Sequence, residues 1–315
     1  MDMTSKRFIQ ALQDHNLDEI KRVPKSDLHN HFVLGGDRKF IKEKTGIDIN
    51  PYKGIMCSMD EMHKWVEVNM GEKFNCLEMR QLLVDATIIQ AAKDGIHILE
   101  IGEDVWGLDE YFQSNIKMLI DSFKQSQMKY GEQIELRLQI GMSRHCSIKY
   151  LEKCLEPFWD EKSFYSIDLY GDEKYQPIEN FKGIYQKARS QGLKLKAHVG
   201  EWGSASDVRT AIEILELDEV QHGISAVKSK EVIKYLRENK IRLNITPTSN
   251  VVLGRVENFK KHPIGELYNS GIDVTINSDD ILIFDSDVSK EYLRLYESGV
   301  LSADDLDDIR RNGLR

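Results

Sequence analysis

The chain has 315 residues, and its 43 Lys and Arg against 52 Asp and Glu give a formal net charge of −9. This acidic balance disfavours nucleic-acid binding and attachment to a membrane surface, because proteins of both classes present basic side chains to phosphate. Hydrophobic residues make up 41% and charged residues 30% of the chain, a composition that excludes a disordered or fibrous protein. We therefore expect a globular protein without a nucleic-acid or membrane partner.

The cysteines and the apolar runs predict a cytoplasmic location. Four cysteines lie far apart without any Cys-x-x-Cys pair, which suits a reducing compartment. They are Cys57, Cys76, Cys146 and Cys154. Residues 1–14 hold no apolar run long enough for a signal peptide, and no uncharged apolar stretch approaches the ~18 residues needed to cross a bilayer.

Eight short apolar or alternating runs, each followed by a turn signal, predict eight strands. In chain order they are 25–29, 96–101, 134–140, 164–169, 193–198, 219–222, 241–245 and 272–276. Amphipathic segments follow the later runs, at 180–190, 204–215 and 229–239. Strands that alternate with such helices pair in parallel, and eight units favour an α/β fold of the closed (β/α)₈ TIM-barrel type over an open sheet. No linker composition divides the chain, so we expect one domain over residues 1–315.

Residues 32–94, between the first two predicted strands, are far more than one crossover helix needs. Their apolar side chains recur at helical spacing and predict several amphipathic helices. They include Met56, Met62, Trp65, Met70 and Phe74. Such stripes most often pack in the core, which is the simplest interpretation. The functional alternative is a helical insertion that forms a wall or lid over a pocket beside the first strand.

Polar side chains suited to a metal ion end several predicted strands. His29 and His31 end the first strand, and because residues two apart in an extended segment point to one side, both imidazoles could reach one cation. His198 ends the fifth strand and is followed by a turn to Glu201, and His222 ends the sixth. Taken singly, each of these residues is more often structural.

Asp279 and Asp280 follow the eighth predicted strand. Two other aspartate pairs, 304–305 and 307–308, are interpreted as a solvent-exposed helical face, so a pair of aspartates is weak evidence by itself. The stronger signal for the first pair is its position after a predicted strand. The sites of (β/α)₈ enzymes are built where strands end. Histidines and carboxylates at four strand ends suit a catalytic divalent ion such as Zn²⁺ with an open position for water. Such an ion lowers the pKa of water towards ~7, which predicts metal-assisted hydrolysis.

Six segments resemble the motifs of one known family. They are Pro24–His31, Ile167–Glu173, Ala197–Glu201, His222–Gly223, Thr246–Asn250 and Asn277–Asp280. In residue type and in order they resemble the adenosine deaminase-type metallohydrolases, the adenosine/AMP deaminase family of the amidohydrolase superfamily. The resemblance implies a (β/α)₈ barrel and the metal-dependent removal of an amino group from a purine.

The resemblance also implies how the site residues divide the work. One zinc ion per chain would be held by His29, His31, His198 and Asp279. Glu201 is implied to protonate purine N1, and His222 to orient and stabilise the attacking hydroxide. Asp280 is implied to hydrogen-bond N7, and the backbone of Gly171 to meet N3. Attack at C6 then gives a tetrahedral centre that expels ammonia.

The resemblance also narrows the metal count. Binuclear relatives in the superfamily carry a bridging lysine after the fourth strand, whereas that strand ends here in residues 167–171 without one. A mononuclear site is therefore implied. The cysteine ligand pair of the cytidine-type zinc deaminases has no counterpart in this chain.

The chain departs from the family pattern beside the second histidine. The usual Leu-Asp-Gly, whose aspartate contacts the ribose 5′-hydroxyl, is replaced by Phe32–Gly36, and the nearest acid is Asp37. We therefore expect ribose recognition to differ. Ile281 and Gln221 replace a proline and a glycine, with an expected effect on loop stiffness. Because the chain ends at Arg315, we expect the terminal helix of the family to be short or missing.

The leading hypothesis is a zinc-dependent deaminase that removes the 6-amino group of adenosine or a related aminopurine nucleoside. The same reaction on adenine or on a modified, 5′-substituted adenosine is the alternative, motivated by the missing ribose-contact aspartate. A catalytically silent purine-binding barrel is the third hypothesis, and Glu201, His222 and Asp280 argue against it. The acidic charge and the lack of a basic cluster favour an uncharged nucleoside or base over a nucleotide. No motif specifies an oligomeric state.

Overall fold

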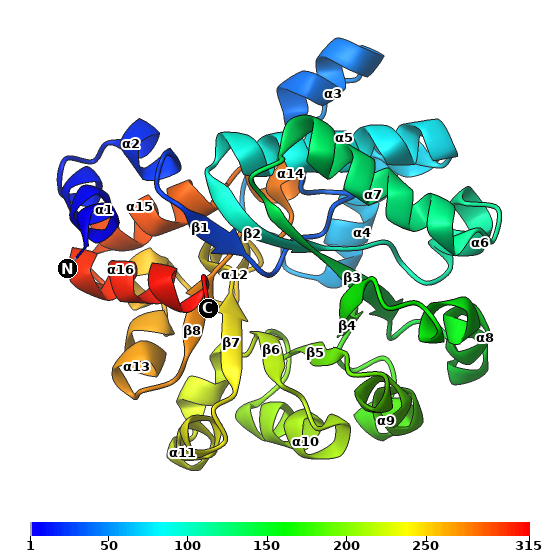
Figure 1. Cartoon of the computed structure of the whole chain (residues 1–315). Helices are drawn as coiled ribbons and strands as arrows, with labels where there is room; N and C mark the ends of the chain where they lie inside the picture. The colour runs from blue at the N-terminus through cyan, green and yellow to red at the C-terminus, as the bar shows by residue number, and fades with distance from the viewer. Residues whose placement is uncertain (1) are drawn as a thin grey trace.

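The computed structural model describes residues 2–315 and centres on one parallel sheet of eight strands. The strands are hydrogen-bonded in sequential order, and helices cover the outside of the sheet (Figure 1). They are β1 (Lys25–Asp27), β2 (Ile96–Ile101), β3 (Glu135–Ser143), β4 (Phe164–Tyr170), β5 (Lys194–Val199), β6 (Glu219–His222), β7 (Arg242–Ile245) and β8 (Val274–Ile276). The predicted α/β barrel of the TIM type is confirmed, and the open sheet is wrong.

The seam between β1 and β8 is joined by backbone and side chains together. Asn30 and Asp279 form an isolated parallel bridge, and the amide of Asp279 donates to the carbonyl oxygen of His29 at 2.9 Å. The carboxylate of Asp27 accepts hydrogen bonds from the amide and the hydroxyl of Ser278, at 3.1 and 2.5 Å. The barrel is therefore tied together at the end where the predicted site residues lie.

Helices connect the later strands as the sequence predicts. Outside the insertion the helices are α1 (Met3–Gln13), α2 (Leu17–Lys21), α6 (Gly107–Tyr111), α7 (Ile116–Tyr130), α8 (Ile148–Trp159), η2 (Ile178–Phe181), α9 (Lys182–Ser190), α10 (Ala205–Leu215), η3 (Ile224–Lys228), α11 (Lys230–Glu238), α12 (Pro247–Val252), η4 (Phe259–Lys261), α13 (Ile264–Asn269), α14 (Ile281–Phe284), α15 (Val288–Ser298) and α16 (Ala303–Asn312). The hydroxyl groups of Ser204 and Ser229 accept hydrogen bonds from the first turns of α10 and α11, so each helix begins at a serine N-cap.

The segment between β1 and β2 is the helical insertion that the sequence predicts. It contains α3 (Arg38–Thr45), α4 (Met59–Asn69), η1 (Gly71–Phe74) and α5 (Leu77–Lys93), and α5 leads into β2. Met56, Trp65 and Phe74 are buried, as the core interpretation predicts. Met62 on α4 instead lines a cavity, as the wall interpretation predicts. The two interpretations therefore hold for different side chains of the insertion.

The interior of the barrel next to the site is charged but paired. Lys196 on β5 is fully buried, and its ammonium group lies 2.8 Å from a carboxylate oxygen of Glu100 on β2 and 2.9 Å from one of Glu219 on β6. Because residues two apart on a strand point to the same side, Lys196 and His198 both face the inside of the barrel. These ion pairs cross-link three strands close to His198.

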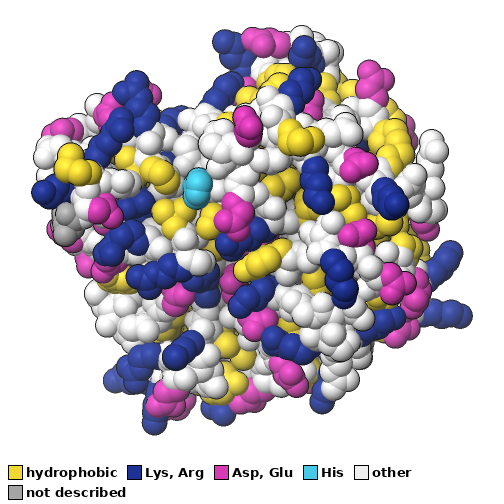
Figure 2. Space-filling view, viewed as in Figure 1, with side chains coloured by type: hydrophobic (Ala, Val, Ile, Leu, Met, Phe, Trp, Pro, Cys, Tyr) yellow, Lys and Arg dark blue, Asp and Glu magenta, His cyan; other side chains and the backbone are white. Residues whose placement is uncertain are grey.

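Both ends of the chain lie at one side of the barrel, where α1 and α16 pack together (Figure 1). Phe8 on α1 meets Tyr292 on α15 edge to face, with ring centroids 5.2 Å apart. Basic and acidic side chains are mixed over the face shown in Figure 2. Within residues 2–315, no helix is long and apolar enough to cross a membrane.

Candidate metal centre and active site

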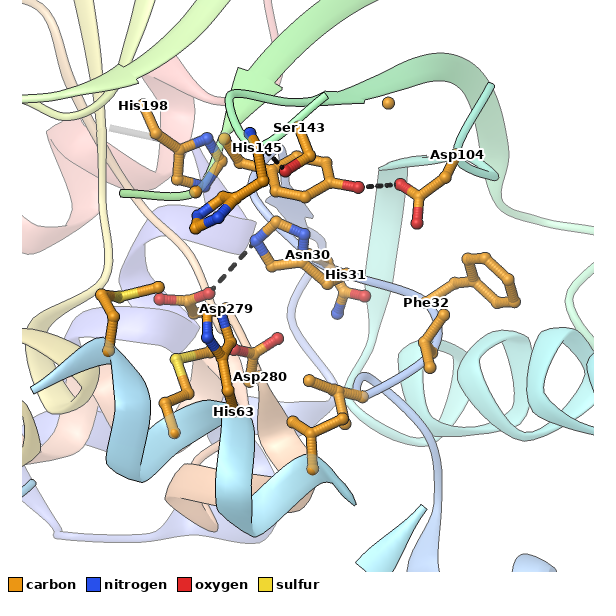
Figure 3. Close-up of a pocket in the computed structure, with 18 of the residues that line it drawn as sticks. Asn30, His31, Phe32, His63, Asp104, Ser143, His145, His198, Asp279 and Asp280 are labelled. Carbon is orange, nitrogen blue, oxygen red and sulfur yellow. Dashed lines mark hydrogen bonds and ion pairs between the residues drawn. The ribbon is translucent and has the colours of Figure 1, made fainter. Parts of the chain in front are cut away.

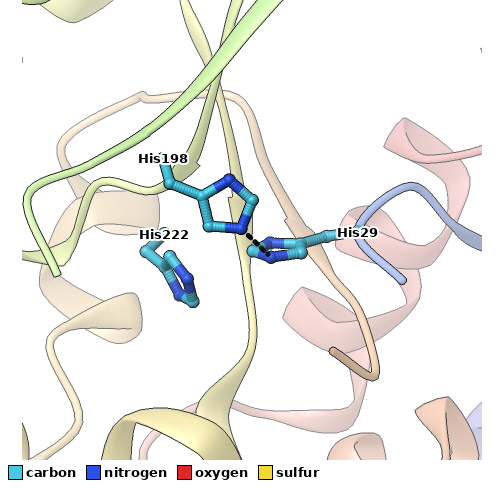
Figure 4. Close-up of side chains that lie close together, drawn as sticks. All are labelled: His29, His198 and His222. Carbon is cyan, nitrogen blue, oxygen red and sulfur yellow. Dashed lines mark hydrogen bonds between the residues drawn. The ribbon is translucent and has the colours of Figure 1, made fainter. Parts of the chain in front are cut away.

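Histidines from three strand ends converge at one end of the barrel. Ring nitrogens of His29, His198 and His222 lie within 4.8 Å of one another (Figure 4). Ligand atoms of His29, His31 and Asp279 form a second group with the same spacing, which shares His29 with the first. The structure thus gathers the four residues that the resemblance implies as zinc ligands, with His222 beside them.

The hydrogen bonds of His29 and His198 leave one nitrogen of each ring free for a cation. Nδ1 of His29 lies 3.1 Å from the carbonyl oxygen of Asn244, and Nδ1 of His198 lies 3.1 Å from the carboxylate of Asp168. Because both partners are acceptors, Nδ1 carries the proton in each ring and Nε2 carries the lone pair. The two Nε2 atoms are 3.0 Å apart, and a cation bound by both would remove the repulsion between their lone pairs. This donor set fits a divalent metal such as zinc.

Asp279 supplies a carboxylate to the same cluster. One of its oxygens lies 3.5 Å from Nε2 of His31 and 3.8 Å from Nε2 of His29. The backbones of Asp279 and His222 have φ angles of 61° and 64°, which residues other than glycine rarely adopt. Strained conformations of this kind persist where the surrounding structure holds a functional side chain in place.

Glu201 lies in the loop after β5, and Glu173 holds that loop. The carboxylate of Glu173 accepts hydrogen bonds from three consecutive backbone amides, those of residues 200–202, at 2.7, 2.9 and 2.7 Å. Burial and the nearby carboxylates of Asp279 and Glu173 raise the pKa of Glu201 well above its usual range. Glu201 is therefore suited to donate a proton near neutral pH.

His222 lies between Glu201 and the start of α12. Its Nε2 is 3.6 Å from a carboxylate oxygen of Glu201, and its Nδ1 is 3.0 Å from the hydroxyl of Thr246 and 3.3 Å from the side-chain nitrogen of Asn250. Burial and the neighbouring histidines lower the pKa of His222 well below its usual range. A neutral imidazole in this position can accept a proton or a hydrogen bond from water.

Asp280 carries an unpartnered carboxyl group in the site. It is 1% exposed, and neither oxygen has a hydrogen-bond partner among residues 2–315. Burial and the carboxylates of Asp279 and Glu201 raise the pKa of Asp280 well above its usual range. Because a buried polar group without a partner is costly, this carboxyl group is available for a hydrogen bond with a ligand.

One cavity of about 330 Å³ is lined by six of these side chains: His31, His198, Glu201, His222, Asp279 and Asp280. Figure 3 shows His31, His198, Asp279 and Asp280 around it. Gly171 also lines the cavity, with a φ of 97°, and a Cβ atom there would lie 2.9 Å from the ring of His145. The backbone at this position therefore requires glycine. Helix α4 forms part of the wall through Met59, Met62, His63 and Val66.

The segment after His31, where the sequence departs from the family pattern, contributes no carboxylate to the cavity. Val33 lines the cavity with an apolar side chain. Asp37, the nearest acid in the sequence, accepts a hydrogen bond from the amide of Phe40 at 2.7 Å and pairs with Lys93 at 2.7 Å. Asp37 therefore caps α3 and does not replace the missing aspartate in the cavity.

Residues 71–315 match the model of the family described as adenosine deaminase. The chain is also 31% identical over 287 residues to a putative adenosine/adenine deaminase of Treponema pallidum (strain Nichols), in a match that covers 91% of this chain and 96% of that protein. The chain belongs to the adenosine deaminase family. This confirms the family that the sequence motifs resemble, and the protein is a hydrolase of the deaminase type.

Two solved structures share the fold of this deaminase. An adenine deaminase from Arthrobacter aurescens superposes with a TM-score of 0.79 at 23% identity and covers 93% of both chains. An amidohydrolase from Burkhoderia ambifaria with bound Zn superposes with a TM-score of 0.76 at 18% identity, covering 100% of this chain and 88% of the other. Both likenesses extend over the whole barrel.

Sequence reasoning assigns no role to three residues of the deaminase site. Asp168 and Glu173 lie within a quoted motif, but their contacts to His198 and to the loop after β5 join different strands. Asp104 lines the cavity three residues after the end of β2. His198 and Asp279 are recognised in the sequence because each is a polar residue at the end of a predicted strand. Asp104 also follows a predicted strand, so the same signal could have identified it.

Proposed function

We propose that this deaminase hydrolyses the 6-amino group of adenosine or a related aminopurine nucleoside, giving an inosine-type product and ammonia. The proposal rests on the observation that Glu201 and Asp280 line the same cavity. Both are carboxyls whose pKa values are raised, so both can donate hydrogen bonds near neutral pH. A 6-aminopurine has acceptor nitrogens, N1 and N7, on either side of its amino group, which complements two such donors.

We assign one zinc ion to His29, His31, His198 and Asp279. When bound, zinc would lower the pKa of a water molecule so that hydroxide forms near neutral pH. Asp168 holds the ring of His198 by accepting the hydrogen bond from Nδ1.

The other site residues then have separate tasks. Glu201 gives its proton to N1 while the oxygen nucleophile adds to C6, so negative charge does not build up on the ring. His222 accepts the proton of the nucleophile and holds its oxygen in place. Asp280 donates to N7, and the backbone amide of Gly171 donates to N3. His222 then gives its proton to the amino nitrogen, which leaves C6 as ammonia. The C6 hydroxyl returns a proton to the carboxylate of Glu201 as the 6-oxopurine forms.

The cavity favours an uncharged substrate over a nucleotide. Among the lining residues of the described chain, Arg80 is the one lysine or arginine. Two nitrogens of its guanidinium group bond to the carboxylate of Glu103, so its charge is already neutralised. Phosphate would therefore meet no free cation in this wall.

Adenine is the second candidate substrate. The apolar side chain of Val33 in the cavity wall, with Asp37 directed elsewhere, favours a ligand without a hydroxyl group at that position. The T. pallidum relative carries both substrates in its name, adenosine/adenine deaminase, which supports a 6-aminopurine without choosing between base and nucleoside.

Ammonia release from adenosine, 2′-deoxyadenosine, 5′-deoxyadenosine and adenine tests the proposal and ranks the candidates. We expect turnover of adenosine by the zinc-loaded protein. Glu201→Gln should keep the zinc and lose about 10²–10⁴-fold in kcat, because the proton donor is gone. Glu213→Gln, on the exposed side of α10, is the matched control and should be fully active. Zinc-loaded protein that releases no ammonia from any of the four compounds would contradict the proposal.

A further inference from the structure

Asp104 is a carboxyl group in the cavity wall that the proposed reaction does not use. Beyond the end of β2 the chain continues beside β3, where Asp104 and Gly141 form an isolated bridge and the amide of Val105 donates to Gly141 at 3.0 Å. The hydroxyl of Tyr170, on β4, donates a hydrogen bond to Oδ1 of Asp104. Figure 3 shows Asp104 with this bond as a dashed line. Both side chains line the cavity.

The position of this carboxyl group is prepared by its neighbours. A Cβ atom at Gly141 would lie 2.8 Å from Oδ1 of Asp104, so glycine is what leaves room for the carboxyl group. The ring centroid of Tyr170 lies 5.7 Å from that of His31, so the tyrosine spans the distance from a candidate metal ligand to Asp104. Asp104 therefore faces the cavity one tyrosine side chain away from the metal cluster.

The strand order separates Asp104 from the reacting groups. Glu201 and Asp280 follow β5 and β8 and His222 ends β6, whereas Asp104 follows β2 and its partner Tyr170 ends β4. A purine whose amino group lies at the metal cluster must direct its remaining part along the cavity. The arc from β2 to β4 is the part of the barrel mouth that is left to receive it.

The chemistry of Asp104 indicates what it receives. Tyr170 occupies Oδ1, and Oδ2 has no hydrogen-bond partner among residues 2–315, so one acceptor is free to face the cavity. Burial and the carboxylate of Glu103 raise the pKa of Asp104 to about 7, so a hydrogen-bond donor from a ligand would stabilise its charged form. On an N9-substituted aminopurine the ring edges away from the amino group offer acceptors, whereas the hydroxyl donors are on the sugar.

We propose that Asp104, positioned by Tyr170, accepts a hydrogen bond from a ribose hydroxyl of the substrate and favours the nucleoside over the free base. The inference rests on the proposed function and names the substrate class of the same site. Because Val33 is apolar and Asp37 pairs with Lys93, the segment after His31 offers no carboxylate to the sugar, and Asp104 supplies one from the segment after β2. The carboxylate that recognises the sugar therefore comes from the segment that follows β2.

The test compares kcat/KM on adenosine with kcat/KM on 9-methyladenine, which has the same base but no sugar. For Asp104→Asn we expect the ratio of adenosine to 9-methyladenine to fall about tenfold, the loss typical of one hydrogen bond to a charged group. Tyr170→Phe should lower the ratio in the same direction by a smaller factor, and it carries the test if Asp104→Asn does not fold. Glu110→Gln, exposed on α6, is the control and should keep the wild-type ratio.

Other outcomes would overturn the inference. An unchanged ratio in both variants means that Asp104 does not recognise the sugar. A larger loss on adenine than on adenosine means that Asp104 binds the N9–H group of the base. If the wild type binds adenosine without releasing ammonia, the proposed function fails, and calorimetry of adenosine binding tests the inference separately. A tenfold weaker affinity of Asp104→Asn for adenosine keeps the inference. Equal affinities of the variant and the wild type reject it as well.

Discussion

At the scale of single residues, the site depends on which nitrogen of each histidine carries its proton. His29 and His198 have unlike Nδ1 partners, the carbonyl oxygen of Asn244 and the carboxylate of Asp168, but both partners are acceptors. Each therefore directs the lone pair of Nε2 into the cluster. The partner of His29 is a backbone carbonyl, which a substitution does not remove. The partner of His198 is the side chain of Asp168, which can be replaced.

Replacing Asp168 tests this arrangement. Asp168→Asn puts a neutral amide, a weaker acceptor, against Nδ1 of His198, so we expect zinc affinity or kcat to fall by about 10- to 100-fold. A zinc-competition titration and a measurement of kcat report the two effects. Asp160→Asn, exposed at the end of α8, is the control. Wild-type zinc affinity together with wild-type kcat would remove Asp168 from the metal centre.

The sequence predicted where the chemical groups lie better than how they are held. His198 and Asp279 could be recognised because each follows a strand, and strand ends meet at one end of a parallel barrel. Their ligand roles stay predictions. Asp168 and Glu173 could not be assigned in the same way. The Asp168 contact runs from β4 to β5, and the Glu173 hydrogen bonds join the loops that follow these two strands, so both depend on a strand register that no local pattern contains.

At the scale of elements, the loop after β5 is ordered by one side chain. Glu173 accepts three amide hydrogen bonds from residues 200–202 with its single carboxylate. The loop therefore does not need a regular turn to present Glu201 to the cavity. The same negative charge also contributes to the raised pKa of Glu201.

Glu173→Gln separates these two effects. An amide oxygen is a poorer acceptor than a carboxylate, so the loop loosens and we expect kcat to fall by about tenfold with the zinc retained. Removing a like charge lowers the pKa of Glu201, and its protonated form is then lost at a lower pH. The alkaline limb of the kcat profile should therefore move to lower pH.

The pH profile distinguishes this role from a general loss of stability. A variant that merely unfolds more easily would lose activity without moving the alkaline limb. Glu179→Gln, exposed in η2, is the matched control and should keep the wild-type profile. A wild-type profile with wild-type kcat in Glu173→Gln would show that the loop does not need this carboxylate.

The helical insertion shows the limit of periodicity at this scale. Apolar residues at helical spacing predict helices there, and α3, α4 and α5 form. The same pattern cannot separate Trp65, which packs in the core, from Met62, which lines the cavity. That difference depends on where α4 lies over the barrel, and tertiary contacts decide it.

At the scale of the whole molecule, the barrel brings together groups that are far apart in the sequence. His29 and Asp279 are joined across the closing seam, where the amide of Asp279 donates to the carbonyl oxygen of His29. The contact that closes the barrel therefore also holds Asp279 beside His29 in the candidate metal site. The barrel could be predicted because eight strand and helix units recur along the chain. The irregular seam after β1 could not be predicted: the expected strand covers residues 25–29, but β1 ends at Asp27.

Metal removal and restoration test the central claim, that this deaminase uses a single metal held by the strand ends. Chelator-treated protein should release no ammonia from adenosine, because water would then lack the ion that lowers its pKa. Activity should return in proportion to added Zn²⁺ and saturate near one ion per chain. Full activity in protein shown by metal analysis to be free of metal, or saturation only at two ions per chain, would contradict the account.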